Sequence, residues 1–401
     1  MNKKILIITP KFPIPTTGAC EQERLAGMLQ LKRLGFDVRV IGRIFEWQNE
    51  EEIIKWGREH DVKIDVVPYE FSSREKSSIF KKIRKLLNPI DWDGSAYEYT
   101  QANIKQLTID ILQSWQPDAA WFDYTYLWPL YQIFKAKNIP IITRSINFEA
   151  IHFLHEDGRS LINYLKFLPK FFSELKIVKK SDYVFSITPA EEKLYKKLGA
   201  KNIDTLPLRS LPALVKQRRE IREPDVLHLF FMGASYNVSH NYKAAELIIK
   251  EIAPEVERRA PGKFFFHILG KKLPENLAKL CLNNIKEEGF VENLEQFLVN
   301  EVDIAVIPSI MGAGMQQKIF EPLVYGIPTV TSKRGLAGYP YENGKHVLCA
   351  KNKDEFVEQL LKLKDRSLRK KLSANALRLS SELFARERLN TIVQQAVRDI
   401  T

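Results

Sequence analysis

Short apolar runs alternate with longer amphipathic stretches along most of the chain. The first runs cover residues 4–10 and 36–44, with a helical pattern over residues 23–34 between them. Similar runs recur at 119–124, 139–146 and 182–188, and a second series occupies 226–233, 263–270, 304–310 and 327–332. Apolar runs of this length, separated by helical patterns, are typical of βαβ units around a parallel sheet. The pattern therefore predicts an α/β protein.

A proline-rich and charged segment separates the two series of runs. Residues 206–225 contain Pro207, Pro212 and Pro224 among many charged side chains, which is typical of an interdomain linker. We therefore predict two doubly wound domains, residues 1–212 and 213–380. From Asp354 onward the pattern is almost entirely helical.

Composition narrows the class of protein. The 401 residues are 45% hydrophobic and 27% charged, which excludes collagen-like and largely disordered chains. Three widely separated cysteines fit neither a disulfide framework nor a paired metal motif, so we expect a reducing compartment. We also expect a cytoplasmic location and neither a metal nor a cofactor. The apolar run near the N-terminus is interpreted as a strand and not as a signal peptide, and no run approaches the ~18 residues of a spanning helix.

The net charge of +12 is compatible with an anionic partner. The sequence contains no recognisable nucleic-acid-binding module, so we expect no nucleic-acid partner.

The best candidate for an anion site is the loop and helix over residues 307–321. Gly312 and Gly314 would let a phosphate approach the backbone where a helix begins, and Lys318 would follow in its first turns. Glu321 could then accept hydrogen bonds from paired hydroxyls such as those of a ribose. The alternative is that both glycines serve only a tight turn from strand to helix.

Residues 312–339 closely resemble the donor-nucleotide motif of the retaining glycosyltransferases of family four, which adopt the two-domain GT-B fold. The matching positions are Gly312, Gly314, Lys318, Glu321, Gly326, Pro328, Val330 and Thr331. The resemblance implies two Rossmann-like domains facing a cleft. Residues 1–212 would bind the acceptor, residues 213–380 would bind the donor, and a helix over 381–401 would cross back to the first domain.

The resemblance extends over nearly the whole chain and implies further site residues. Donor-binding positions would be Gly233, Gly270, Phe290, Val291, Gly312, Gly314, Met315, Lys318 and Glu321. Thr17, Gly18 and Ala19 would form an acceptor or phosphate loop. Residues 144–150 are similar to a segment of some members that runs arginine, x, histidine, asparagine, x, glutamate. Lys318, Glu321, Asn147 and His152 are the implied catalytic residues.

Three positions depart from the family pattern. Ala313 stands where many members carry a first glutamate, and Ala234 where an arginine grips the pyrophosphate. Ile146 replaces a histidine, for which His152 or His155 would have to substitute.

The resemblance implies transfer of a hexosyl group from a UDP- or GDP-sugar to a glycan or lipid-linked acceptor, with retention of configuration. The expected setting is polysaccharide biosynthesis. The alternative is a catalytically degenerate GT-B scaffold that binds a nucleotide.

A basic amphipathic segment suggests where such a protein would meet a lipid-linked acceptor. Over residues 78–89, apolar side chains recur at helical spacing with lysines and an arginine between them. Helices of this type lie on anionic membrane surfaces, which predicts peripheral attachment to the inner face of the plasma membrane. The alternative is a solvated face on a packed helix.

Overall fold

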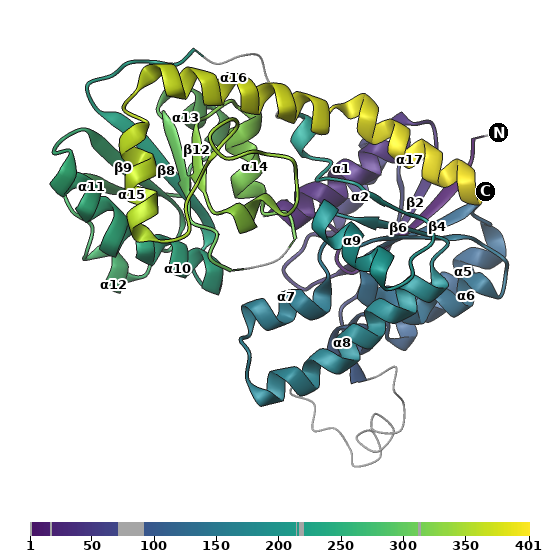
Figure 1. The fold of residues 1–401 in the computed structure, drawn as a ribbon. Coiled ribbons are helices and arrows are strands. Elements are labelled where there is room, and N and C mark those ends of the chain that lie inside the picture. Colours follow the sequence, from purple (N-terminus) through teal and green to yellow (C-terminus); the bar gives the residue numbers. More distant parts are fainter. Residues whose placement is uncertain (1, 17, 71–91, 214, 216–219, 312–313) are drawn as a thin grey trace. The chain divides into compact units, whose positions relative to one another are not determined.

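The computed structural model describes residues 2–16, 18–70, 92–213, 215, 220–311 and 314–401. The chain divides into two compact units (Figure 1). Unit 1 comprises Met1–Ser210 with Leu389–Thr401, and unit 2 comprises Leu211–Arg388. The domain boundaries expected from the sequence, after residues 212 and 380, stay predictions. The segment 78–89 lies outside the described residues.

Unit 1 is built on a seven-stranded parallel sheet with the order β3-β2-β1-β4-β5-β6-β7. Its strands are β1 (Lys4–Thr9), β2 (Asp37–Ile44), β3 (Lys63–Pro68), β4 (Ala119–Asp123), β5 (Ile141–Arg144), β6 (Tyr183–Ser186) and β7 (Ile203–Thr205). Its helices are α1 (Ala19–Arg33), α2 (Glu50–Glu59), α4 (Gly94–Tyr99), α5 (Ala102–Ser114), η2 (Thr125–Leu130), α6 (Tyr131–Lys135), α7 (Glu149–Glu156), α8 (Leu161–Lys180) and α9 (Pro189–Lys197). The strand order reverses between β1 and β4.

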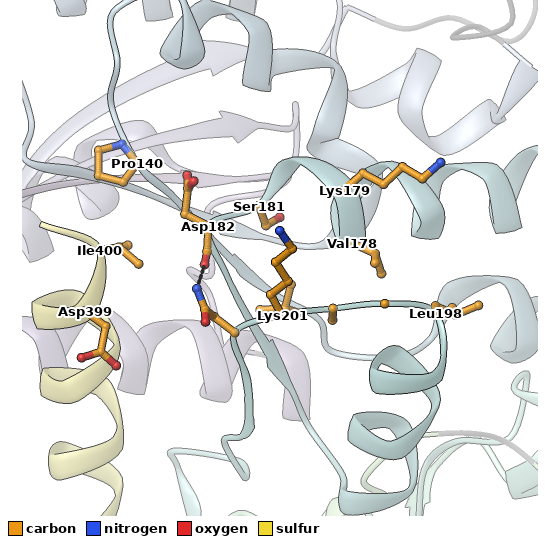
Figure 2. Close-up of a pocket in the computed structure, with 13 residues that line it drawn as sticks. Pro140, Val178, Lys179, Ser181, Asp182, Leu198, Lys201, Asp399 and Ile400 are labelled. Atoms are coloured by element: carbon orange, nitrogen blue, oxygen red, sulfur yellow. Dashed lines mark hydrogen bonds between the residues drawn. The ribbon is translucent and has the colours of Figure 1, made fainter.

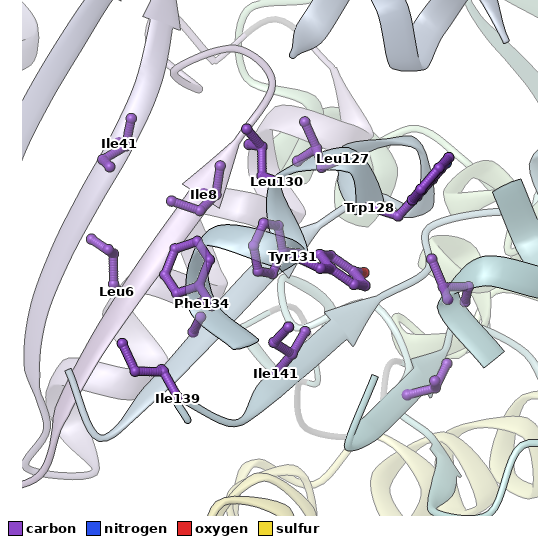
Figure 3. Packing of buried hydrophobic residues seen from close by; sticks show 14 of the residues in the cluster. Leu6, Ile8, Ile41, Leu127, Trp128, Leu130, Tyr131, Phe134, Ile139 and Ile141 are labelled. Atoms are coloured by element: carbon purple, nitrogen blue, oxygen red, sulfur yellow. The ribbon is translucent and has the colours of Figure 1, made fainter. Parts of the chain in front are cut away.

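Two apolar layers cover the two faces of this sheet. Leu6 and Ile8 point into the layer drawn in Figure 3, with Tyr131 and Phe134, whereas Ile5 and Ile7 belong to the opposite layer. Successive side chains of a strand point to opposite faces, so a strand buried on both faces is apolar throughout. This explains why β1 appears in the sequence as one continuous apolar run.

The last helix, α17 (Arg386–Ile400), completes the second apolar layer of unit 1. Its residues Leu389, Val393, Ala396 and Val397 are buried in the same cluster as Ile5 and Ile7. The expected return of the C-terminal helix to the first domain is therefore confirmed.

Unit 2 contains a six-stranded sheet of parallel strands with the order β10-β9-β8-β11-β12-β13. The strands are β8 (Leu227–Ser235), β9 (Phe264–Lys271), β10 (Ile285–Gly289), β11 (Ile304–Ile307), β12 (Thr329–Thr331) and β13 (Leu348–Cys349). The helical segments are η3 (Leu211–Ala213), α10 (Ser239–Leu247), η4 (Ile248–Ile252), α11 (Ala253–Arg259), α12 (Glu275–Ala278), α13 (Leu294–Asn300), α14 (Gln317–Val324), η5 (Lys333–Leu336), α15 (Lys353–Lys362) and α16 (Arg366–Leu383). Both units thus have the predicted doubly wound architecture.

Candidate functional site

The strand order of unit 2 reverses between β8 and β11. In open α/β sheets, ligands bind outside the carboxyl ends of the strands at such a switch point. Helix α10 follows β8 and helix α14 follows β11, so the N-termini of these two helices flank the switch point. The predicted residues Lys318 and Glu321 both lie on α14.

Lys318 links the two flanking helices. Its Nζ donates a hydrogen bond of 2.6 Å to Oδ1 of Asn241 on α10, and Nζ lies 5.3 Å from the ring centroid of Phe231. Asn241 is itself oriented, because its Nδ2 donates to the carbonyl oxygen of Ser235 at 2.9 Å. The ammonium group is therefore held at the switch point, where it can stabilise negative charge on a ligand.

Glu321 lies one turn further along α14 and is also buried. Burial raises the pKa of its carboxyl to about 7, and a hydrogen bond from Gln317 partly opposes this rise. The Gln317 Nε2 to Glu321 Oε2 distance is 3.5 Å. The carboxyl can thus change its protonation state near neutral pH. The protonated carboxyl can donate a hydrogen bond, whereas the ionised carboxylate only accepts them.

The loop before α14 turns through a glycine and is fixed by side chains. Gly314 has φ +70°, a conformation that favours glycine. Met315 is buried, and the hydroxyl of Tyr339 donates to its Sδ at 3.4 Å. Gly312 and Ala313 lie outside the described residues, so their predicted roles stay predictions.

Gly233 and Gly270 are required by the packing of β8 against β9. A Cβ atom on Gly270 would lie 1.7 Å from the carbonyl oxygen of Gly233, and the φ of Gly270 is +136°. A Cβ on Gly233 would lie 2.8 Å from the ring of Tyr236. Both residues lie near the carboxyl ends of their strands, but the contacts that demand glycine there come from the protein itself.

Phe290 and Val291 directly follow β10 and so also lie near the carboxyl ends of the strands of unit 2. Phe290 is 65% exposed, and the Nζ of Lys271 lies 4.8 Å from its ring centroid. An exposed aromatic face with a cation beside it can stack against a planar ligand.

The predicted residues of unit 1 lie after β1 and β5. Gly18 is the N-cap residue of α1 and Ala19 its first residue, whereas Thr17 lies outside the described residues. Glu21 in the first turn of α1 pairs with Lys11 at 2.6 Å, and these contacts keep the pKa of Glu21 below its ordinary value despite burial. Asn147 precedes α7 and His152 is half-buried within that helix.

A polar cluster surrounds the switch point of unit 1. Tyr124, directly after β4, has φ +114° and ψ +144°, a rare conformation for a residue with a side chain. The guanidinium carbon of Arg24 lies 5.7 Å from its ring centroid, and the ring of Tyr126 stacks on it at 5.0 Å. Burial raises the pKa of the nearby Glu149 to about 7, which Lys170 partly opposes. Glu149 was visible in the sequence as the last residue of the motif at 144–149.

Arg144, the first residue of that motif, has a structural role. Its Nη2 lies 2.9 Å from Oε1 of Glu23, and the Nε of Arg209 lies 2.8 Å from the same oxygen. All three side chains are buried. Arg144 therefore connects α1, β5 and the segment after β7.

A cavity of about 620 Å³ lies at the amino ends of strands β5, β6 and β7 in unit 1 (Figure 2). Its lining includes Pro140, Asp182 and Asn202, which precede β5, β6 and β7, and Asn202 donates to the carbonyl oxygen of Asp182 at 2.9 Å. Because these are the amino ends of the strands, the cavity is not at the position where doubly wound sheets bind their ligands.

Two searches of the described residues gave negative results. Over these ranges, no group of three or more His, Cys, Asp or Glu side chains is arranged to hold a metal ion. Within the same part of the chain, no helix combines the length and the apolar character needed to cross a bilayer.

Known structures share the fold across nearly the whole chain. A point mutant of S. aureus TarM in complex with fondaparinux, alpha-GlcNAc-glycerol and UDP matches with a TM-score of 0.68 and 13% identity, covering 98% of this chain and 99% of that one. Anabaena HepE in complex with UDP and glucose matches with a TM-score of 0.67 and 13% identity, covering 99% and 100%. Sucrose-phosphate synthase from Thermosynechococcus elongatus matches with a TM-score of 0.68 and 11% identity, covering 100% and 99%. These neighbours have the GT-B fold, so the GT-B prediction is confirmed.

Sequence comparison finds a family model that matches part of unit 2. No curated protein sequence matches the chain significantly. The family model described as Glycosyl transferases group 1 matches residues 227–366, which include both flanking helices and all the strands of unit 2. Residues 227–366 of this chain thus match the family model described as Glycosyl transferases group 1, and the chain has the GT-B fold.

Proposed function

We propose that the protein is a retaining glycosyltransferase of family four that transfers a hexosyl group from a UDP- or GDP-sugar. The observation that carries this proposal is the Lys318–Asn241 contact, with the buried Glu321 one turn away, at the switch point of a domain matched by the glycosyltransferase family. The TarM and HepE structures contain UDP, which supports a nucleoside diphosphate as the leaving group here.

The proposed chemistry is mainly electrostatic. Breaking the bond between the anomeric carbon and the phosphate oxygen builds negative charge on the diphosphate, which donors fixed in advance stabilise most strongly in the transition state. Lys318 and the backbone amides of Gly314 and Met315 would supply these donors, with no metal required. Glu321 would accept hydrogen bonds from the ribose hydroxyls, and the exposed face of Phe290, with Val291 beside it, would stack against the base.

Unit 1 would bind the acceptor, which we propose to be a glycan or a lipid-linked sugar. Gly18 and Ala19 at the start of α1, Asn147 and His152 near α7, and the Tyr124 cluster all belong to loops or helices that follow strands of this unit. We also propose polysaccharide biosynthesis and a cytoplasmic location at the inner face of the plasma membrane. Attachment through residues 78–89 remains a prediction.

A thermal-shift screen of UDP, GDP, ADP and CMP with their common sugar conjugates tests the donor site. A ligand that binds only the folded state raises Tm by mass action. We expect a shift with one nucleotide that is lost in Lys318→Ala and Glu321→Ala. Glu246→Ala and Lys250→Ala alter an exposed ion pair on α10 and η4 and serve as matched controls. Unchanged affinity in folded Lys318→Ala and Glu321→Ala would contradict the assignment.

A degenerate scaffold is the second candidate function. It is favoured by Ala313, Ala234 and Ile146, which lack the side chains that family members use on the pyrophosphate and donor sugar. This candidate predicts a thermal shift with a nucleotide but no release of UDP or GDP from any donor sugar.

For the glycosyltransferase proposal, NMR of the anomeric proton of a transferred product would test retention of configuration.

A further inference from the structure

Helix α8 exposes an apolar stripe. Leu161, Leu165, Leu168 and Phe172 are spaced four, three and four residues apart, which places them along one side of the helix. The exposed fractions of the three leucines are 79%, 63% and 60%. We call these four residues the α8 stripe. Large apolar side chains gathered in this way on a protein surface mark an interaction site.

The stripe continues onto a neighbouring tryptophan. Trp92, which precedes α4, is 53% exposed and lines a shallow pocket of about 420 Å³ together with Leu165, Leu168, Pro169 and Phe172. In Figure 1, α7 and α8 form a helical pair at the side of the unit 1 sheet. The exposed apolar surface is thus formed by side chains of one unit.

The charges of helix α8 itself are mostly positive, although Lys170 is paired with the buried Asp93 at 3.4 Å. Helix α8 contains five lysines, at positions 166, 170, 176, 179 and 180, and Arg159 is exposed just before it. Its single acidic residue, Glu174, is buried and accepts hydrogen bonds from the backbone of Glu149 and the hydroxyl of Tyr195. The exposed surface of α8 therefore combines apolar and cationic groups without an acidic side chain.

The lysines also lie close to the apolar groups. The Nζ of Lys176 lies 4.5 Å from the ring centroid of Phe172, and the Nζ of Lys170 lies 5.4 Å from that of Phe153. Lys166 is exposed, within one turn of Leu165 and Leu168. At a bilayer surface, apolar side chains enter the boundary with the acyl chains while lysine ammonium groups reach the phosphates.

We propose that the α8 stripe, Trp92 and the lysines of α8 dock unit 1 onto a lipid bilayer that contains anionic lipid. The charge favours this occupant over a second copy of the chain. Two copies that met through α8 would oppose two lysine-rich surfaces, whereas anionic headgroups complement them. The proposal does not rest on glycosyl transfer, because vesicle binding is measured without donor or acceptor.

Co-sedimentation of the full chain with phosphatidylcholine vesicles, with and without phosphatidylglycerol, tests the proposal. We expect binding to the anionic vesicles, weakened about tenfold or more in Leu165→Asp/Leu168→Asp and at high salt. Leu280→Asp/Leu282→Asp makes the same change at exposed leucines of unit 2 and should bind as the wild type does. Circular dichroism establishes that each variant is folded.

A second pair of variants separates charge from apolar contact. Lys166→Glu/Lys179→Glu leaves the stripe intact and should weaken binding to anionic vesicles about tenfold. Wild-type protein that ignores anionic vesicles, or a folded Leu165→Asp/Leu168→Asp that binds as the wild type does, would overturn the proposal. The proposal would also be overturned if light scattering showed that the wild type is a dimer and that Leu165→Asp/Leu168→Asp is a monomer with unchanged vesicle binding.

Discussion

Replacing Glu321 by glutamine should change stability and nucleotide binding in opposite directions. The carboxyl is 6% exposed, and burial raises its pKa from 4.5 to about 7. Between these values the folded protein keeps a proton that the unfolded chain has released, so the free energy of unfolding falls as pH rises. The full loss, about 3 kcal/mol, is reached above pH 7. Glutamine has the shape of the protonated acid and carries no charge at any pH.

Glu321→Gln should therefore equal the wild type in stability near pH 4 and exceed it by up to about 3 kcal/mol at pH 8. Nucleotide binding should follow the reverse trend, because ribose hydroxyls donate to an ionised carboxylate. Wild-type affinity for the nucleotide should rise as pH rises through 7. The variant should bind more weakly at pH 8, by about tenfold or more, and lose this pH dependence.

Urea unfolding and titration calorimetry at pH 5 and pH 8 measure both effects on the same samples. Glu275→Gln, at an exposed residue of α12, controls for a change of charge in unit 2. A stability difference between wild type and Glu321→Gln that is identical at both pH values would refute the reasoning. If the affinity for the nucleotide changed neither with pH nor with the substitution, Glu321 would not be part of the binding site. The argument about stability would be unaffected.

Three further substitutions test the packing that supports the two sheets. Gly270→Ala should destabilise unit 2 by about 3 kcal/mol or more in chemical denaturation, because its Cβ would overlap the carbonyl of Gly233. The control Gly262→Ala has open space around its Cβ and φ +66°, so it should cost only about 1 kcal/mol. Glu23→Gln removes the carboxylate that two buried guanidinium groups share and should cost about 3–5 kcal/mol, seen as a lower Tm. An unchanged Tm would contradict this. Leu389→Ala should cost about 2–5 kcal/mol and increase amide hydrogen exchange in α17 and β1, and exchange confined to α17 would show that the helix does not support the sheet.

Much of the fold could be predicted from the sequence because parallel strands buried on both faces form continuous apolar runs. The apolar runs at 4–10, 226–233 and 263–270 correspond to β1, β8 and β9, and the proline-rich segment lies between β7 and β8. The positions of Lys318 and Glu321 on a helix after β11 followed from the turn of glycines before them.

Contacts between distant residues could not be predicted. The resemblance of residues 144–149 to a family motif suggested a site, yet Arg144 contacts Glu23, 121 residues away, and serves the core of unit 1. The close approach of Gly270 to Gly233 depends on the register of β9 against β8, which no local pattern specifies. The left-handed backbone of Tyr124 has no sequence signal, because tyrosine rarely adopts that conformation.

The division of the chain has a consequence for dissecting the protein. Unit 2 is one uninterrupted stretch, Leu211–Arg388, whereas unit 1 is assembled from two stretches on either side of it. A fragment of residues 1–210 would lack α17 and leave the apolar face around Ile5 and Ile7 open to water and to aggregation. Unit 2 can therefore be exchanged as a single cassette between related chains, while unit 1 can be transplanted only together with its terminal helix.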